Sequence, residues 1–319
     1  MSERIHSGAG GTDRARTVLL FVLVAVLILG TGVVQSWNTA LVILNMGLVS
    51  AIMSLGVNMQ WGFAGLFNVG VMGFVALGGL AAVLVGMPPV PEAWAAGGPR
   101  IIGALLLGAG VIALAVTLYK RMTPGRTRAF LVFAVVVVGF FVYRGLLDPA
   151  KEAVESVDPA ATGYLGGLGL PIVLAWPVGG LLAAGAAWVI GKVALGLRSD
   201  YLAIATLGIA EIVIAILKNE DWLSRGVKNV IGLPRPVPYE IDLQQDPAFV
   251  ERAASLGMDP ATASSITVKL GYSAFFTVVL VIILIAAQLA LNSPWGRMMR
   301  AIRDNETAAE AMGKDVTGR

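Results

Sequence analysis

The apolar run Tyr272–Leu291 (YSAFFTVVLVIILIAAQLAL) is followed at once by the polar, basic stretch Asn292–Arg319 (NSPWGRMMRAIRDNETAAEAMGKDVTGR). The run is long enough to cross a bilayer as an α-helix, which takes roughly 20 residues. A spanning helix that ends in a charged segment presents that segment at the membrane surface, where it meets lipid headgroups or a soluble protein. This junction therefore predicts a membrane protein whose last segment is an anchor or a docking element.

The composition extends this prediction to the whole chain. Of its 319 residues, 57% are hydrophobic and 13% are charged, whereas soluble domains average about 45–50% apolar and 25% charged residues. The chain has no cysteine, and its one histidine, His6, lies in a polar tail at residues 1–17. These counts exclude a thiolate nucleophile, a disulfide framework and a histidine-cluster metal site. We expect neither an enzyme nor a metal cofactor, and no nucleic-acid partner.

Eight apolar runs predict an all-α, polytopic transmembrane helical bundle. When the runs are threaded alternately, one side of the membrane holds 14 of the 23 lysines and arginines but 7 of the 20 acids. Positive charge favours the cytoplasmic side, so we expect both termini there. The transmembrane domain then covers residues 18–291, with an outer loop at 218–271 and a cytoplasmic segment at 292–319. The runs are Val18–Val34, Thr39–Val57, Val71–Gly86, Ile101–Tyr119, Ala129–Leu147, Pro171–Ile190, Leu195–Leu217 and Tyr272–Leu291.

The connecting segments carry local signals. Met87–Arg100 contains four prolines and is predicted to be a loop. In the outer loop, Asp246–Leu256 predicts a helix that Asp246 caps, with Pro247 as its first residue. The final segment has the same pattern, because Ser293 precedes Pro294.

A second short helix is predicted in the final segment, over Glu306–Met312. Asn305 is expected to cap its start, and Gly313 is expected to end it. Two short helices at the cytoplasmic surface suit either a soluble partner or an anionic lipid surface.

Two polar features interrupt the apolar runs. Asn58–Gly70 (NMQWGFAGLFNVG) is either a broken helix that lines a substrate path or a short cytoplasmic turn. Glu211 is a carboxylate inside a span, which either pairs with neighbouring helices or takes part in transport. Gly185–Lys192 (GAAWVIGK) fails as a P-loop, because its spacing is too long and Val193 replaces the required serine or threonine. Any ATP hydrolysis must therefore occur on another polypeptide.

The final segment resembles the cytoplasmic loop of the branched-chain amino-acid ABC-transporter permeases. The family pattern is Ser-Pro-aromatic-Gly-Arg, then Arg-Ala-Ile-Arg, then Asn-Glu and Ala-Ala, then Gly. The spacing of Ala308, Ala309 and Gly313 also resembles the coupling helix of ABC importers, with Thr307 where glutamate is usual. The matching residues are Ser293, Pro294, Trp295, Gly296, Arg297, Arg300, Ala301, Ile302, Arg303, Asn305, Glu306, Ala308, Ala309 and Gly313.

Three other stretches carry the same resemblance. Gln60–Leu80 resembles the family's glycine-rich segment near the substrate path, with Asn68 where many members have serine. Leu197–Leu217 resembles a Leu-Arg-x-Asp-Tyr-Leu-Ala-Ile run followed by Gly-x-x-Glu-Ile. Leu223–Pro236 resembles the outer loop that follows. Where the family often has a Gly-Gly pair and a second glycine, this chain departs from it with Arg225-Gly226 and Asn229.

The resemblance implies a permease subunit of an ATP-driven importer for leucine, isoleucine and valine that works by alternating access. It implies a bacterial inner-membrane location and four kinds of neighbour: a homologous permease, two ATPase subunits that bind the ATP, an extracytoplasmic binding protein and membrane lipid. Family members usually continue with further spans, so we expect the chain to be truncated after the coupling segment. Implied ATPase-coupling residues are Arg300, Arg303, Glu306, Ala308, Ala309, Glu310 and Gly313, and candidate substrate-path residues are Asn58, Gln60, Gly62, Gly65, Asn68 and Gly70.

Alternatives remain open at this point. The same machinery would also suit the import of urea, short amides or nucleosides. An ion-coupled secondary transporter built around Glu211 is a hypothesis from another class, and so is a membrane scaffold that transports nothing.

Overall fold

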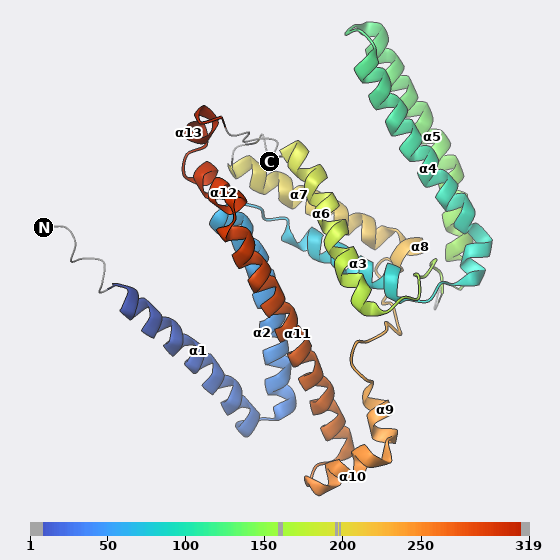
Figure 1. Ribbon diagram of the computed structural model, residues 1–319. Helices are drawn as coiled ribbons and strands as arrows, with labels where there is room; N and C mark the ends of the chain where they lie inside the picture. Colours follow the sequence, from blue (N-terminus) through green and yellow to red (C-terminus); the bar gives the residue numbers. More distant parts are fainter. Residues whose placement is uncertain (1–8, 159–161, 195–196, 198, 314–319) are drawn as a thin grey trace, which may run out of the picture. The chain divides into compact units, whose positions relative to one another are not determined.

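The computed structural model describes residues 9–158, 162–194, 197 and 199–313. Within these ranges the chain is helical, and extended backbone pairs at one isolated bridge, between Pro89 and Gly166. Seven helices of the described part are long and apolar enough to cross a membrane, and α3 (Val71–Gly86) is a shorter apolar helix. The predicted all-α, polytopic bundle is thus confirmed. The chain forms two compact units, one from Met1–Phe67 and Arg235–Arg319 and one from Asn68–Pro234 (Figure 1).

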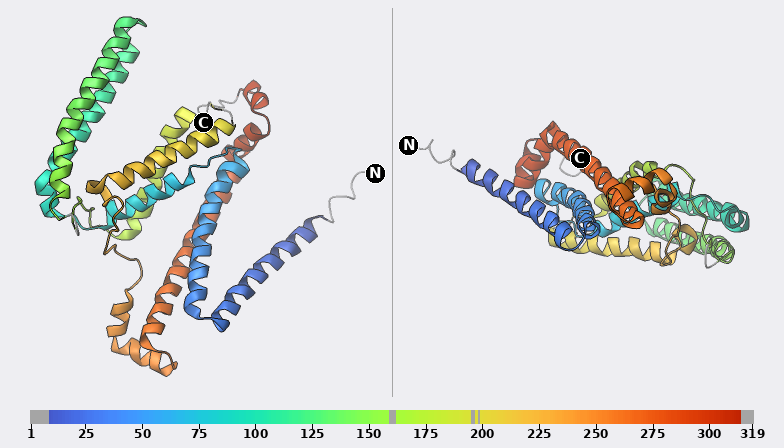
Figure 2. Two further views of the ribbon diagram at one scale, coloured as in Figure 1. Left: turned by 180° about the vertical axis from the view of Figure 1, so that it is seen from behind. Right: turned by 90° about the horizontal axis from the view of Figure 1, so that it is seen from below.

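The first unit is organised around α2 (Trp37–Asn58) and α11 (Pro260–Asn292), which lie side by side (Figures 1 and 2). Its other helices are α1 (Ala9–Val34), the π-helical turn η1 (Met59–Phe63), α9 (Glu240–Gln245), α10 (Pro247–Ser255), α12 (Pro294–Asp304) and α13 (Glu306–Ala311).

Polar side chains join α2 to α11. Asn38 Oδ1 accepts hydrogen bonds from Ser265 Oγ and Lys269 Nζ, both at 2.9 Å. Two turns further along α2, Asn45 donates to the Lys269 carbonyl at 3.1 Å and accepts from Ser273 Oγ at 2.7 Å. Such bonds strengthen the packing of helices in lipid, where the hydrophobic effect does not drive helices together.

The same bonds show that α2 and α11 run parallel. The contact moves from Asn38 to Asn45 along α2 as it moves from Ser265 to Ser273 along α11. If each of the seven long helices crossed the membrane and α3 did not, the second and the last of them would run in opposite directions. If all seven long helices cross, the parallel pair requires the segment that contains α3 to cross as well, which gives the eight spans that the sequence predicts.

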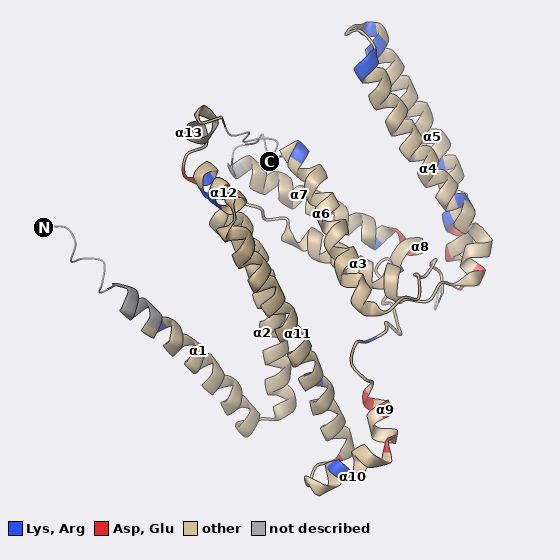
Figure 3. Cartoon of the chain, in the orientation of Figure 1, with Lys and Arg blue, Asp and Glu red and all other residues tan. Residues whose placement is uncertain are grey.

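The second unit contains a long antiparallel hairpin and a group of three helices. The hairpin is formed by α4 (Pro91–Arg121) and α5 (Arg126–Glu155), and its turn carries a cluster of lysines and arginines (Figure 3). In the group, α3 packs against both α6 and α7. The remaining elements are η2 (Ile172–Leu174), α6 (Ala175–Ala194), α7 (Ser199–Asn219) and α8 (Asp221–Ser224).

One sequence prediction is wrong. The proline-rich segment Met87–Arg100 is not a loop throughout, because α4 begins at Pro91 and continues through Pro99. Proline is well tolerated in the first turn of a helix, where its missing N–H has no intrahelical partner. The early part of α4 is also buried against α5: the Ala150 carbonyl occupies the space where a Cβ at Gly97 would lie. This packing outweighs the helix-breaking tendency of Pro99.

Candidate functional site

A tight corner joins the last spanning helix, α11, to the surface helix α12. Ser293 is the N-cap of α12, and its hydroxyl accepts a hydrogen bond from the Gly296 backbone N–H at 3.4 Å. Pro294 is the first helical residue, as predicted. A Cβ at Gly296 would collide with the backbone of Leu291, so the corner requires glycine here.

Two arginines of α12 hold this corner. Arg300 Nη2 donates to the Leu291 carbonyl at 3.2 Å, and Arg297 Nη1 donates to the Asn292 carbonyl at 3.0 Å. The last carbonyls of α11 have no intrahelical partner and carry the negative end of the helix dipole, so cationic donors suit them. Arg300, which the resemblance assigns to ATPase coupling, is therefore engaged with its own chain.

The short helix α13 has the predicted ends. Asn305 Oδ1 accepts from the Ala308 backbone N–H at 3.0 Å, which caps the start of the helix. Gly313 has a φ of 76°, the left-handed conformation that ends many helices. Ala309 is buried, whereas Ala308, Met312 and Gly313 are exposed. The placement of the Glu306 and Glu310 side chains lies outside the described part.

The candidate path segment is irregular. The α2 helix passes into the π-helical turn η1, and the chain is then non-helical until α3 begins. The Asn58 carboxamide oxygen occupies the space where a Cβ at Gly62 would lie, and the Gln60 carbonyl accepts from the Leu66 N–H at 2.9 Å. Single π-helical turns of this kind occur frequently at functional sites.

Arg303 connects the coupling segment to this turn. Its Nη1 donates to the Gly62 carbonyl at 2.6 Å, and its Nε and Nη2 donate to Asp304 Oδ1 at 3.0 and 2.7 Å. Gly65 has a φ of 71°, and a Cβ added there would lie 2.6 Å from Arg303 Cγ. Candidate path residues and a candidate coupling residue therefore meet within the first unit.

The last two path residues belong to the second unit, where they pack on α7. Gly70 N–H donates to Asn68 Oδ1 at 2.8 Å, which forms a tight turn. The Val69 N–H donates to Thr206 Oγ1 at 3.2 Å, and the Thr206 carbonyl occupies the space where a Cβ at Gly70 would lie. Thr206 is a buried hydroxyl that the sequence analysis missed, because a lone threonine in an apolar run gives no signal.

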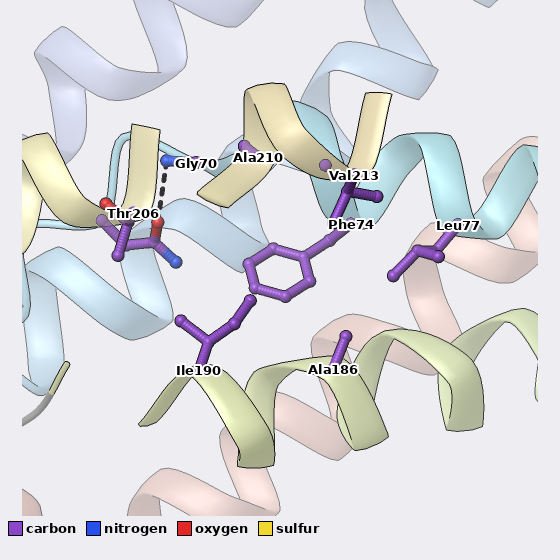
Figure 4. Close-up of a pocket in the computed structure, with 10 residues that line it drawn as sticks. Gly70, Phe74, Leu77, Ala186, Ile190, Thr206, Ala210 and Val213 are labelled. Carbon is purple, nitrogen blue, oxygen red and sulfur yellow. Dashed lines mark hydrogen bonds between the residues drawn. The ribbon is translucent and has the colours of Figure 1, made fainter. Parts of the chain in front are cut away.

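A cavity lies beside this turn (Figure 4). Phe74 projects into it from α3 toward Ile190 of α6. Its volume is about 10 Å³, close to the smallest space that admits one water molecule. In this conformation the cavity is thus far too small for an amino acid. Its lining is formed by Asn68, Gly70, Gly73, Phe74, Leu77, Ala186, Ile190, Thr206, Ala210 and Val213.

Glu211 does not line this cavity, although its neighbour Ala210 does. Within the second unit the Glu211 side chain is exposed, and among the described residues no side chain forms an ion pair with it. A carboxylate at the middle of a span is costly unless protein or water surrounds it.

The segment between α7 and α9 contains a second feature that sequence reasoning missed. Arg225 ends α8 with a φ of 62°, a left-handed conformation that favours glycine. Its side chain is 5% exposed, and Nη1 donates to the Asn229 carbonyl at 2.7 Å. The positions that differ from the family pattern therefore contact each other. The replacement of the family's glycines by Arg225 and Asn229 was the signal in the sequence that could have pointed to this contact.

Together, the long apolar helices define a polytopic, multi-pass membrane protein. Residues 39–318 match the family described as "Branched-chain amino acid transport system / permease component", and the chain belongs to this family.

Two curated relatives share part of the sequence. The chain is 32% identical over 142 residues to the high-affinity branched-chain amino acid transport system permease protein LivM of Escherichia coli. It is 30% identical over 148 residues to the protein of the same name from Salmonella typhimurium. The matched regions cover 43% and 44% of this chain but 32% and 33% of the relatives, about a third of their length. No solved structure matches the chain.

Proposed function

We propose that this chain is a permease subunit of an ATP-driven importer in a bacterial inner membrane. A homologous permease, two cytoplasmic ATPase subunits and an extracytoplasmic binding protein complete the complex. The proposed substrates are leucine, isoleucine and valine, the class of substrate named for the family and for both relatives.

The observation that best supports this proposal is the construction of α12 and α13. Three arginines of α12 bond to backbone or side-chain oxygens of their own chain, which holds the helix as a fixed extension of α11. Beyond it, α13 presents the exposed residue Ala308, and the exposed residues Met312 and Gly313 follow the helix. A short helix with small side chains, held rigidly at the end of a span, suits a groove on an ATPase subunit.

The proposed mechanism is alternating access. The ATPase dimer binds two states of the permease with different affinity, and this difference is the free energy that shifts the spans from one state to the other. The 10 Å³ cavity beside Gly70 is consistent with a state in which the path is closed. The turn at Asn68–Gly70 and Phe74 would have to move apart for substrate to pass.

Uptake assays in a deletion strain test the substrate and the energy source. Cells that express the chain with its neighbouring genes are expected to import labelled leucine, and deletion of the ATPase genes should abolish the import. If the cells import urea or a nucleoside and not leucine, the proposed substrate class is wrong and the imported compound takes its place. Uptake that survives loss of the ATPases but collapses with the proton gradient would favour the ion-coupled alternative that uses Glu211.

Substitutions in α13 test the coupling role. Gly313→Val forces a β-branched residue into a left-handed conformation just after α13, and Glu306→Lys reverses a charge in the first turn of α13. Both are expected to abolish uptake while the permease stays in the membrane at the normal level. Normal uptake in both variants would contradict the proposed role of α13.

A further inference from the structure

We propose that Arg303 is the residue that transmits movement of the coupling segment to the broken segment that follows α2. This inference rests on the proposed function, because it assumes that an ATPase subunit displaces α12 and α13. It assigns Arg303 a positioning role inside the permease, in place of the direct ATPase contact that the resemblance implies.

The geometry of the guanidinium carries the proposal. Asp304 accepts from Nε and Nη2, which leaves Nη1 directed at the Gly62 carbonyl, 2.6 Å away. The contact with Asp304 fixes the orientation of the planar guanidinium group, and this orientation directs Nη1 at the Gly62 carbonyl. The Gly62 carbonyl lies in the last turn of a helix, where intrahelical partners are missing and a cationic donor is favoured.

The contact is also sterically close. Gly65 is in a left-handed conformation, and a Cβ there would lie 2.6 Å from Arg303 Cγ and 3.4 Å from Arg303 Cβ. Glycine thus allows the arginine stem to lie directly on the backbone of the turn. The hydrogen bond to the Gly62 carbonyl pulls the turn when α12 moves away from it, and the close packing of the Arg303 stem on Gly65 pushes the turn when α12 moves toward it.

The turn is part of the candidate path and leads to its last two residues, Asn68 and Gly70. Four residues lie between Gly65 and Gly70. In this stretch the Val69 N–H donates to Thr206 Oγ1 of α7, and the Gly70 N–H donates to Asn68 Oδ1. A displacement of α12 by an ATPase therefore reaches the start of α3 through a short length of chain. Arg303 and Gly62 lie 241 residues apart in the sequence, so the two segments are linked here by this contact and not by the nearby chain.

The first experiment compares two arginines in the complete complex, expressed in its own host. Arg303→Ala is expected to lower substrate uptake about tenfold, within the range typical of coupling between sites, while the ATPase subunits still co-purify. Arg128→Ala is the matched control, because Arg128 also donates to a carbonyl near a helix end, that of Tyr119 at 3.4 Å, but in the α4–α5 turn. The control is expected to import at the wild-type rate.

The second experiment replaces the contact with a covalent bond. The chain has no cysteine, so Gly65→Cys combined with Arg303→Cys introduces a single pair. Its Cβ separation of 3.4 Å is near the range of about 3.5–4.5 Å found in disulfides. The reduced pair is expected to import slowly, like Arg303→Ala, and oxidation is expected to restore uptake.

Each outcome decides the inference. Wild-type uptake in Arg303→Ala, or an oxidised pair that imports no faster than the reduced pair, would overturn it. Loss of ATPase co-purification in Arg303→Ala would show that Arg303 contacts the ATPase, which overturns the inference but leaves the proposed function intact. If ATPases fail to co-purify with the wild-type permease, the proposed function fails and the inference with it.

Discussion

Arg225 allows two opposing contributions to stability to be separated by two substitutions at one position. Its backbone adopts a left-handed conformation, which costs roughly 1 kcal/mol for a residue other than glycine. Its buried side chain donates to the Asn229 carbonyl, and a bond from a charged donor contributes about 1.5–3 kcal/mol. The side-chain bond outweighs the backbone cost, so the native arginine is favoured.

Both Arg225→Ala and Arg225→Gly lose this bond, but only glycine removes the backbone cost. We expect the alanine variant to lose about 2–3 kcal/mol of stability and the glycine variant about 1 kcal/mol less than that. For a chain of this size, a difference of 1 kcal/mol corresponds to a Tm difference of about 2 °C.

Thermal unfolding of the purified complex measures the order of stability of the wild type and the two Arg225 variants. The glycine variant should unfold about 2 °C above the alanine variant, and both should unfold below the wild type. Arg235→Ala is the control, because the ion pair of Arg235 with Glu240 is exposed and should contribute little. An alanine variant as stable as the glycine variant would refute the argument from backbone conformation. A glycine variant as stable as the wild type would refute the argument from the buried bond.

Three further predictions follow from the described contacts. Burial raises the pKa of Tyr164 above its usual value and the charge of Arg225 lowers it, so Arg225→Gly should raise this pKa further, as phenolate absorbance during a pH titration would show. Since the pKa in the folded protein is raised, the stability linked to Tyr164 is present below pH ~10 and is lost as the pH rises through the folded pKa. Gly296→Ala should disrupt the α11–α12 corner and lower uptake and ATPase co-purification, whereas Gly56→Ala, which meets no atom within 4 Å, should change neither. Thr206→Val leaves the Val69 N–H without its acceptor and should cost about 1–3 kcal/mol in thermal unfolding.

Much of the fold follows from local rules. The apolar run Val71–Gly86 coincides with α3, and Asp246, Ser293 and Asn305 cap the helices that follow them. Hydropathy over about 20 residues and the first-turn N–H groups of a helix are properties of short stretches of chain, so one sequence suffices to predict them.

Contacts between distant parts of the chain could not be predicted in this way. The helix through Pro99 forms because Gly97 packs on α5, and the sequence of 91–100 alone indicates a loop. The bond of Arg303 to Gly62 joins residues 241 positions apart, and the Thr206 hydroxyl holds a turn 137 positions away. Periodicity and composition carry no information on such pairs.

The arginines of α12 show why a motif match alone does not define a binding surface. The family resemblance predicts that Arg300 and Arg303 couple to an ATPase, yet both bond to carbonyls of their own chain. One continuous motif contains both the residues that build a rigid support and the residues that touch the partner. Their positions in the sequence do not distinguish the two groups. The structure divides them by contact: α12 packs on α11 and η1, whereas Ala308 and Met312 of the following segment are exposed. Substitution of Arg303 should therefore alter how a bound ATPase drives the spans, and substitutions on the exposed side of α13 should alter whether it binds.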